Sequence, residues 1–182
     1  PGSHVYNRAL MASIIAAKGL GDAEKWAKGL VSNLAKRPQG NDRSQLKSIY
    51  SGECDVAIIN HYYYGKLTYS KNPDHRKWAK ASIIVFPNQG SSDRGAHVNI
   101  SGGGVVKFSK NKESATKFLE FLVTDEAQVL YGDVNFEYPI NNKSKLPKRL
   151  KALGTFKEDS LLIEDIAKLA PKAQEIIDTV YW

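Results

Sequence analysis

One short run of residues limits the fold of this chain more than any other: the apolar segment Val56–Ile59, followed by Asn60, His61 and three consecutive tyrosines. The apolar segment is rich in β-branched residues and comes shortly after Gly52, which is typical of a strand buried on both faces, as in a parallel sheet. Tyr62–Tyr64 then stand where the strand passes into a helix. Because ligands of open α/β sheets bind beyond the carboxyl ends of the strands, this turn is the candidate binding site.

Three adjacent phenols support two interpretations. A phenol that has lost its proton is a hard, anionic metal ligand, but it normally titrates near pH ~10, so several phenolates at neutral pH need a strongly charged cation such as Fe3+. In the second interpretation Tyr62–Tyr64 form a half-buried aromatic cluster or a protein interface, since aromatic residues are common at strand ends. The residues by themselves leave both interpretations open.

Composition narrows the class of protein. At 182 residues the chain is long enough for one domain or two small ones, and its single cysteine excludes an internal disulfide and a cysteine-based metal cluster. The formal net charge of +7 suggests nucleic acid, but the lysines are scattered and no basic-aromatic RNA motif is present, so we expect no nucleic-acid partner. No apolar run approaches membrane-spanning length, and no signal peptide is recognisable before the first expected helix.

The tyrosine turn resembles a segment of the bacterial periplasmic ferric-ion-binding proteins, the iron(III)-binding components of ABC transporters. The shared pattern is Gly-Glu, Asp, Asn, a tyrosine pair, Gly and Leu. Further stretches of the chain are similar to the same family. In this sequence the matching residues are Gly52-Glu53, Asp55, Asn60, Tyr62-Tyr63, Gly65 and Leu67, together with Ser3-His4-Val5-Tyr6-Asn7, Pro38-Gln39-Gly40-Asn41-Asp42, Phe136-Glu137-Tyr138-Pro139 and the stretch from Gly95 to Gly104.

The resemblance implies a fold and a domain organisation. The expected fold class is α/β: a lobe like those of type II periplasmic binding proteins, with a mixed sheet flanked by helices. Relatives are longer at the N-terminus, so we expect a fragment. Residues 1–105 would form most of the C-terminal lobe of a two-lobe protein, and residues 106–182 a helical remainder with hinge and packing helices that partly contribute to the other lobe.

The resemblance also implies metal ligands. Tyr6, Tyr62 and Tyr63 would bind Fe3+ as phenolates, while Tyr64 would be a packing residue. Tyr6 precedes a helix with Leu10, Met11, Ile14 and Ile15 on one face, so it lies at a helix N-terminus, where negative charge is favoured. On the residues alone, Tyr6 would more often be a packing residue at the start of a helix.

Three further residues are expected beside the metal. Asn41, Ser3 and His61 are candidates for contact with an anion or for an outer position around the ligands, and a synergistic anion such as carbonate would complete the coordination. For Asn41 the plain alternative is a turn residue in the cluster Pro38–Asp42. Neighbouring residues on a helix do not share a face, so His61 is not expected to be a ligand itself.

The function that follows is ferric-iron binding as the substrate-binding component of an ABC iron importer. Its partner would be a membrane permease, its location the periplasm, and it would not be an enzyme. One alternative is a solute-binding protein of the same fold for an organic anion or a ferric chelate. A second is an enzyme whose catalytic groups lie in the missing part.

The remaining elements follow from periodicity. Apolar runs predict strands at residues 82–86 and 96–100, and an amphipathic helix after Asn111 would bury Ala115, Phe118, Leu119 and Leu122. A further helix starts at Thr124 and ends at Gly132. The other helices are expected from about Asp22, from Asp42 to Tyr50, from the tyrosine turn to Tyr69, from Ser160 to Leu169 and from Pro171 to Tyr181.

Overall fold

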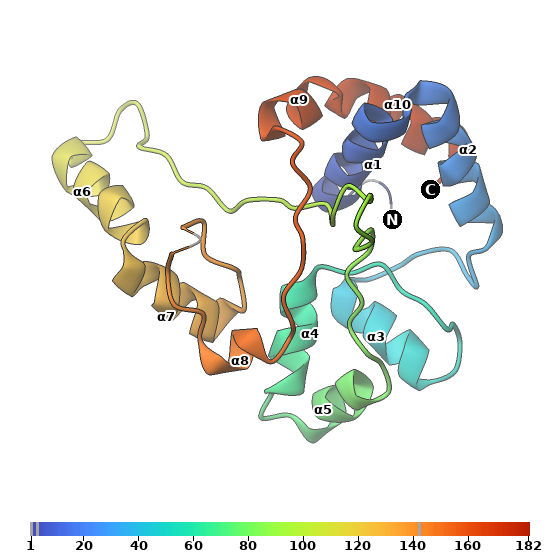
Figure 1. Ribbon diagram of the computed structural model, residues 1–182, viewed down its shortest axis with the longest axis horizontal. Coiled ribbons are helices and arrows are strands. Elements are labelled where there is room, and N and C mark those ends of the chain that lie inside the picture. Colours follow the sequence, from blue (N-terminus) through green and yellow to red (C-terminus); the bar gives the residue numbers. More distant parts are fainter. Residues whose placement is uncertain (1, 3, 142) are drawn as a thin grey trace. The chain divides into compact units, whose positions relative to one another are not determined.

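The computed structural model describes residues 2, 4–141 and 143–182, and within them the regular structure is helical. The helices, drawn in Figure 1, are α1 (Val5–Lys18), α2 (Leu20–Ser32), α3 (Asp42–Tyr50), α4 (His61–Thr68), α5 (Pro73–Lys80), α6 (Lys112–Leu122), α7 (Asp125–Asn135), α8 (Lys148–Lys151), α9 (Ile163–Lys168) and α10 (Ala170–Val180).

The chain divides into two compact units, each made of separate stretches of sequence. The first consists of Pro1–Gly40, Phe86–Ile100 and Phe156–Trp182, and the second of Asn41–Val85 and Ser101–Thr155. The boundary that we expected between residues 105 and 106 therefore falls inside the second unit. The assignment of these stretches to the lobes of a two-lobe protein stays a prediction.

In the first unit α1, α2, α9 and α10 pack on one another. Helix α1 follows its predicted pattern: Met11, Ile14 and Ile15 are buried, and Gly19 ends the helix with a φ of 78°. Helix α2 buries the small residues Ala23 and Ala27, which let the neighbouring helices approach closely. The core cluster comprises Met11, Ala12, Ile14, Ile15, Ala23, Ala27, Ile166, Ala173, Ile176, Ile177 and Val180.

In the second unit α3, α4 and α5 pack around Leu46, Leu67 and Ala79. A second cluster joins Phe136, Leu150 and Leu153 to the partly buried rings of Tyr62, Tyr64 and Tyr138. Pro73, which was expected to break the helix before it, also starts α5, where its fixed φ suits the first helical position. Helices α5 and α8 were not predicted from the sequence.

The predicted strands are not formed among the described residues, whose one β contact is an isolated parallel bridge between Ala96 and Glu158. The expected burial on both faces was wrong for this chain. Val56 and Ile83 are 81% and 82% exposed, while their neighbours Ala57 and Ile84 are half-buried. A strand needs a neighbouring strand for its ladder hydrogen bonds, and no described segment supplies one beside these two.

Helix α6 is amphipathic as predicted, but it has no buried residue. Phe118 is 59% exposed, so the expected burial of the apolar face was wrong within the described structure. Asn111 stands at the N-cap without a capping hydrogen bond from its side chain. The next helix is capped as expected, since the Thr124 hydroxyl accepts from the Ala127 N–H at 3.4 Å, but it runs past Gly132 to Asn135.

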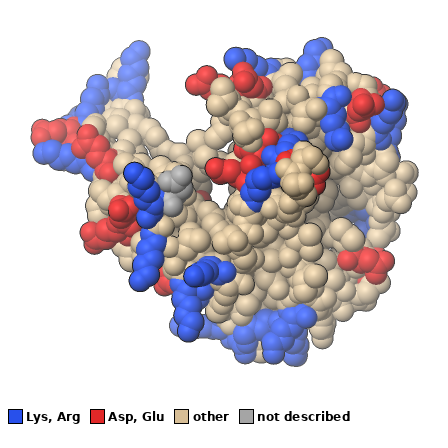
Figure 2. All heavy atoms as spheres, viewed as in Figure 1, with Lys and Arg blue, Asp and Glu red and all other residues tan. Residues whose placement is uncertain are grey.

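On the face drawn in Figure 2, charged side chains are distributed rather than gathered in one stripe. Figure 2 shows basic side chains at several separate places on the visible face, with acidic side chains between several of them. Many of the pairs are local ones within a helix, such as Lys28 with Glu24 and Lys117 with Glu113. No helix in the described ranges is long and apolar enough to cross a membrane.

Candidate metal site

Tyr62 and Tyr63 lie side by side in the first turn of α4, in the second unit. Their ring centroids are 4.5 Å apart and the ring planes are inclined by 38°. Both side chains are partly buried, and Asn60 enters the helix in an extended conformation, with φ −76° and ψ 130°. The backbone N–H groups of a first helical turn favour negative charge, so this position suits two phenolates.

A cation lies over each of the two rings. The Arg43 guanidinium is 5.2 Å from the centroid of Tyr63, and the Lys66 ammonium is 5.3 Å from that of Tyr62. Sequence reasoning missed both residues. Lys66 had a signal, because it stands four residues after Tyr62 and hence on the same side of the helix. Arg43 had none, because it comes from α3.

Tyr64 belongs to the packing of the unit, as expected. Its hydroxyl donates to the carbonyl of Ser82 at 3.2 Å, and its ring packs with the Leu46–Leu67 cluster. Tyr138 is packed in a similar way: its hydroxyl donates to the carbonyl of Gly154 at 2.6 Å, and burial raises its pKa to about 12.

Gly65 lets α4 lie directly against Phe136. A Cβ at this position would meet the Phe136 ring at 2.6 Å, and that ring is only 4% exposed. We expect Gly65→Ala to lower the free energy of unfolding by about 1–3 kcal/mol through overpacking, as measured by urea denaturation. Gly29→Ala is the matched control, because a Cβ there meets nothing within 4 Å and alanine is the better helix former. Equal stabilities of Gly65→Ala and the unchanged protein would contradict the expectation.

His61 is held by the backbone. Its Nε2 donates to the carbonyl of Phe136 at 2.7 Å, and its ring lies against Tyr138 with 5.0 Å between centroids. Burial lowers the pKa of His61, with smaller opposing contributions from the Phe136 hydrogen bond and the Glu137 charge. The ring is therefore held beside the tyrosine pair by a backbone carbonyl and by its contact with Tyr138.

Asn41 caps α3. Its side-chain oxygen accepts from the backbone N–H groups of Arg43 at 3.0 Å and Ser44 at 3.3 Å. Asn41 is thus the N-cap residue of α3, and the helix runs from Asp42 to Tyr50 as predicted. Ser3, the other candidate for anion contact, lies outside the described residues.

Tyr6 lies in the first turn of α1, as the sequence predicted, and belongs to the first unit. Its ring stacks on that of His4, with centroids 5.9 Å apart and planes inclined by 11°, and the side chain is 37% exposed. Asn41, His61, Tyr62 and Tyr63 belong to the second unit. That Tyr6 binds the same metal ion as Tyr62 and Tyr63 is therefore a proposal.

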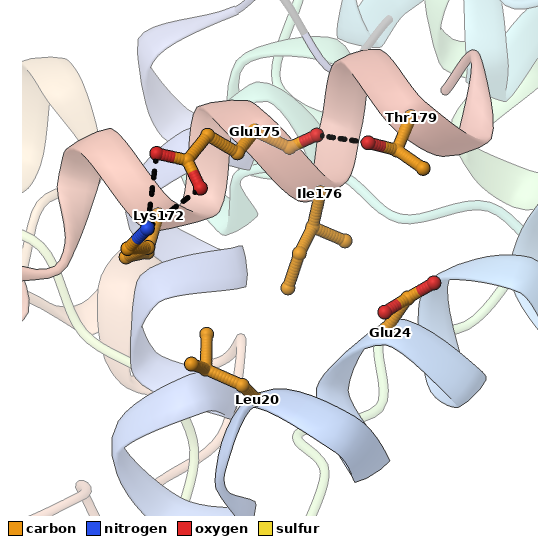
Figure 3. A pocket seen from close by; sticks show the side chains of 6 residues that line it. All are labelled: Leu20, Glu24, Lys172, Glu175, Ile176 and Thr179. Atoms are coloured by element: carbon orange, nitrogen blue, oxygen red, sulfur yellow. Dashed lines mark hydrogen bonds and ion pairs between the residues drawn. The ribbon is translucent and has the colours of Figure 1, made fainter.

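Among the described residues, neither a cluster of metal-binding side chains nor the surface depression near α2 provides another candidate for the predicted site. In the described part of the chain, no group of three or more His, Cys, Asp or Glu side chains is arranged to hold a metal ion. A depression of about 230 Å3 lies between α2 and α10, lined by Leu20, Glu24, Lys172, Glu175, Ile176 and Thr179. Figure 3 shows that Lys172 there pairs with Glu175, at 2.8 Å, and none of the predicted site residues lines it.

The fold and the sequence define a class of protein. The chain belongs to the bacterial extracellular solute-binding protein family, whose profile matches residues 12–129. Among its relatives is iron uptake protein A1 of Synechocystis, 41% identical over 180 residues, an alignment that covers 99% of this chain and 49% of the relative.

Solved structures point the same way. A ferric binding protein from Campylobacter jejuni is 42% identical with a TM-score of 0.92, over 98% of this chain and 56% of that one. A Trichodesmium protein in complex with iron and citrate ligands is 44% identical with a TM-score of 0.91, over 99% of this chain and 56% of that one. The chain thus spans about half the length of these relatives. They are named as iron uptake or iron-binding proteins and not as enzymes, in agreement with the sequence-based expectation.

Proposed function

We propose that this chain is part of the ferric-iron-binding component of an ABC iron importer and that Tyr62 and Tyr63 bind Fe3+ as phenolates. The observation that carries the proposal is the tyrosine pair itself. Two phenols with ring centroids 4.5 Å apart share the first turn of one helix, under the positive charges of Arg43 and Lys66. Opposite charge and helix-terminal N–H groups both favour the phenolate form that a hard trivalent cation requires.

Tyr6 is the proposed third ligand, from the first unit. It shares with the pair its position in a first helical turn, where a phenolate is favoured. Asn41 and Ser3 are proposed to contact a synergistic anion such as carbonate, and His61 to stand behind the ligands. Asn41 would use its amide nitrogen, since its oxygen caps α3.

The proposed architecture is a two-lobe binding protein whose mixed sheet is completed by chain beyond these residues. Exposed apolar side chains on alternate positions support it: Ile83 and Val85 are 82% and 72% exposed, which an isolated lobe would not favour in water. We keep the assignment of residues 1–105 to most of the C-terminal lobe, and of 106–182 to the helical remainder, as part of this proposal. The extracellular solute-binding family supports the proposed location in the periplasm, and a membrane permease is the proposed partner.

A ferric chelate or an organic anion is the second candidate ligand. It is favoured by the two cations at the tyrosine pair and by the Trichodesmium relative, which is in complex with iron and citrate ligands. In this version the anion would occupy coordination positions that the protein leaves open.

Titration with Fe3+ supplied as a weak chelate tests the proposal. We expect a saturable visible band from phenolate-to-iron charge transfer, which is lost on acidification because protons compete for the same oxygens. Thermal protection by citrate without iron, and without the band, would favour the anion candidate. A colourless protein, both as this chain and when extended to the length of its relatives, would overturn the iron proposal.

A further inference from the structure

The first turn of α3 contacts the residue that starts the tyrosine helix. The carboxylate oxygen Oδ1 of Asp42 accepts from the backbone N–H of Asn60 at 2.7 Å and from its side-chain Nδ2 at 3.1 Å. Asn60 is the N-cap residue of α4, and its own side chain makes no capping hydrogen bond. One carboxylate oxygen therefore holds both the backbone and the side chain of the residue two positions before Tyr62.

The turn that carries Asp42 is itself fixed. Asn41 caps α3 by accepting hydrogen bonds from the backbone N–H groups of Arg43 and Ser44. These bonds fix the backbone of Asp42, which lies between Asn41 and Arg43. Asp42 is partly buried, where a charge-assisted hydrogen bond is worth more than at the open surface. The contact spans 18 residues of sequence, and it joins the Pro38–Asp42 turn to the tyrosine turn.

Arg43 extends the same contact to the tyrosines. Its guanidinium lies over the ring of Tyr63, 5.2 Å from the centroid, which places a permanent positive charge beside one of the two phenols. Lys66 reaches Tyr62 from α4 itself, so its position needs nothing from α3. Arg43 reaches Tyr63 only while the starts of α3 and α4 stay together, which is what the Asp42 hydrogen bonds ensure.

We propose that Asp42 and Arg43 are positioning residues of the tyrosine site: Asp42 fixes the start of α4, and Arg43 stabilises negative charge on Tyr63. This inference rests on the proposed function, because it assigns roles in binding to the same pair of phenols. Neither residue needs to touch the metal ion. Asp42 and Arg43 explain how the two tyrosines at the start of α4 are held in place by residues at the start of α3.

Asp42 is tested with Asp42→Ala, Asp42→Asn and the control Asp74→Ala. Asp74 is also a first-turn carboxylate of the second unit, but it pairs with Lys77 at 3.1 Å on the exposed side of α5. We expect Asp42→Ala to weaken Fe3+ binding about 10–100-fold against citrate competition, the usual cost of losing an outer-shell partner, with a changed charge-transfer band. Asp42→Asn keeps an oxygen acceptor and is expected to recover most of the affinity, while Asp74→Ala leaves binding unchanged.

An iron-free measurement checks the contact directly. Amide hydrogen exchange at Asn60 should accelerate in Asp42→Ala and not in Asp74→Ala. Unchanged exchange at Asn60, or iron affinity and band that match the unaltered protein, would overturn the role of Asp42. The role of Asp42 would also be overturned if Asp42→Ala and Asp42→Asn lost the same iron affinity while the Asn60 amide stayed protected from exchange in both.

Arg43 is tested with Arg43→Gln, Arg43→Lys and the control Lys47→Gln. Lys47 is on the same helix and lies over Trp78 at 5.7 Å, so its variant removes the same charge from α3 away from the tyrosines. We expect Arg43→Gln to shift acid release of iron to higher pH, Arg43→Lys to restore it in part, and Lys47→Gln to leave it unchanged. Identical release profiles for Arg43→Gln and Lys47→Gln would overturn the role of Arg43. An unaltered protein that gives no coloured complex, both as this chain and at the length of its relatives, would instead reject the proposed function.

Discussion

Tyr62→Phe and Tyr63→Phe are each expected to lower the affinity for Fe3+ more than about 100-fold and to abolish or strongly weaken the visible band, since even outer-shell partners cost about 10–100-fold. Each substitution removes one phenol oxygen and keeps the ring. The ring contact of 4.5 Å and the packing around α4 are therefore preserved, and the loss reports on the metal bond. Competition with citrate, followed by absorbance, measures it.

Tyr64→Phe is the matched control. It removes the hydroxyl of the neighbouring tyrosine, which donates to the Ser82 carbonyl. We therefore expect the free energy of unfolding to fall by about 1 kcal/mol and iron binding to stay unchanged. Tyr6→Phe extends the test to the first unit and should match the effect of the pair. Full affinity in Tyr62→Phe and Tyr63→Phe would reduce the tyrosines to packing residues, the alternative that the sequence left open.

Acid is expected to destabilise the first unit through His97. Both ring nitrogens of His97 are buried and have no hydrogen-bond partner among the described residues. Burial first, and then the positive charge of Arg94, lowers its pKa to about 4, while Asp159 acts in the opposite direction. Arg94 and Asp159 form an ion pair beside it, and Asp159 is only 4% exposed.

The direction of the pH effect follows from proton binding. Between about pH 6.5 and about pH 4 the unfolded chain protonates this histidine and the folded chain does not, so stability is complete above about 6.5 and falls as the pH is lowered. The two-and-a-half-unit difference sets an upper value of about 3 kcal/mol. Urea unfolding of the protein and of His97→Leu is measured at several pH values between 7.5 and 4. Below about pH 6.5 the unaltered protein should lose stability relative to His97→Leu, and above it the difference between the two should be constant.

A histidine outside this environment provides the control. His75 of the second unit hydrogen-bonds through Nδ1 to Ser70 at 3.1 Å, and His75→Gln is the comparison variant that removes a histidine away from Arg94 and Asp159. Parallel profiles of the unaltered protein and His97→Leu would show that His97 does not govern the acid response.

The helices and the tyrosine site illustrate how far local sequence reaches. The face of Met11, Ile14 and Ile15 and the stop at Gly19 were predictable because the helical period and a glycine with positive φ are local properties. The site residues were named from a motif, and the structure places Tyr62 and Tyr63 together in one turn for the simple reason that they are adjacent. Of the two cations over their rings, the position of Lys66 beside Tyr62 could be predicted from helical spacing, whereas the position of Arg43 over Tyr63 could not.

The predicted strands, which are not formed among the described residues, show what the sequence cannot decide. The run Val56–Ile59 and residues 82–86 have the composition of buried strands, yet their apolar side chains on alternate positions are exposed. Composition states what a segment can pack against, but pairing needs a second strand at the right distance. Helix α6 gives a second example. Its apolar face follows from the spacing of residues within the helix, but the burial of that face depends on contacts with other elements.

By itself, the sequence determined the helical segments of α1, α3 and α4, the family of the protein and the tyrosine pair as its candidate site, because periodicity, caps and adjacent residues act over a few positions. Only the tertiary structure decided that Asp42 holds Asn60 and that Arg43 covers Tyr63, since each contact joins residues about 20 positions apart. It also decided which apolar faces are covered. Hydrogen bonds and burial between distant segments depend on how the chain folds back on itself, and no local pattern encodes that.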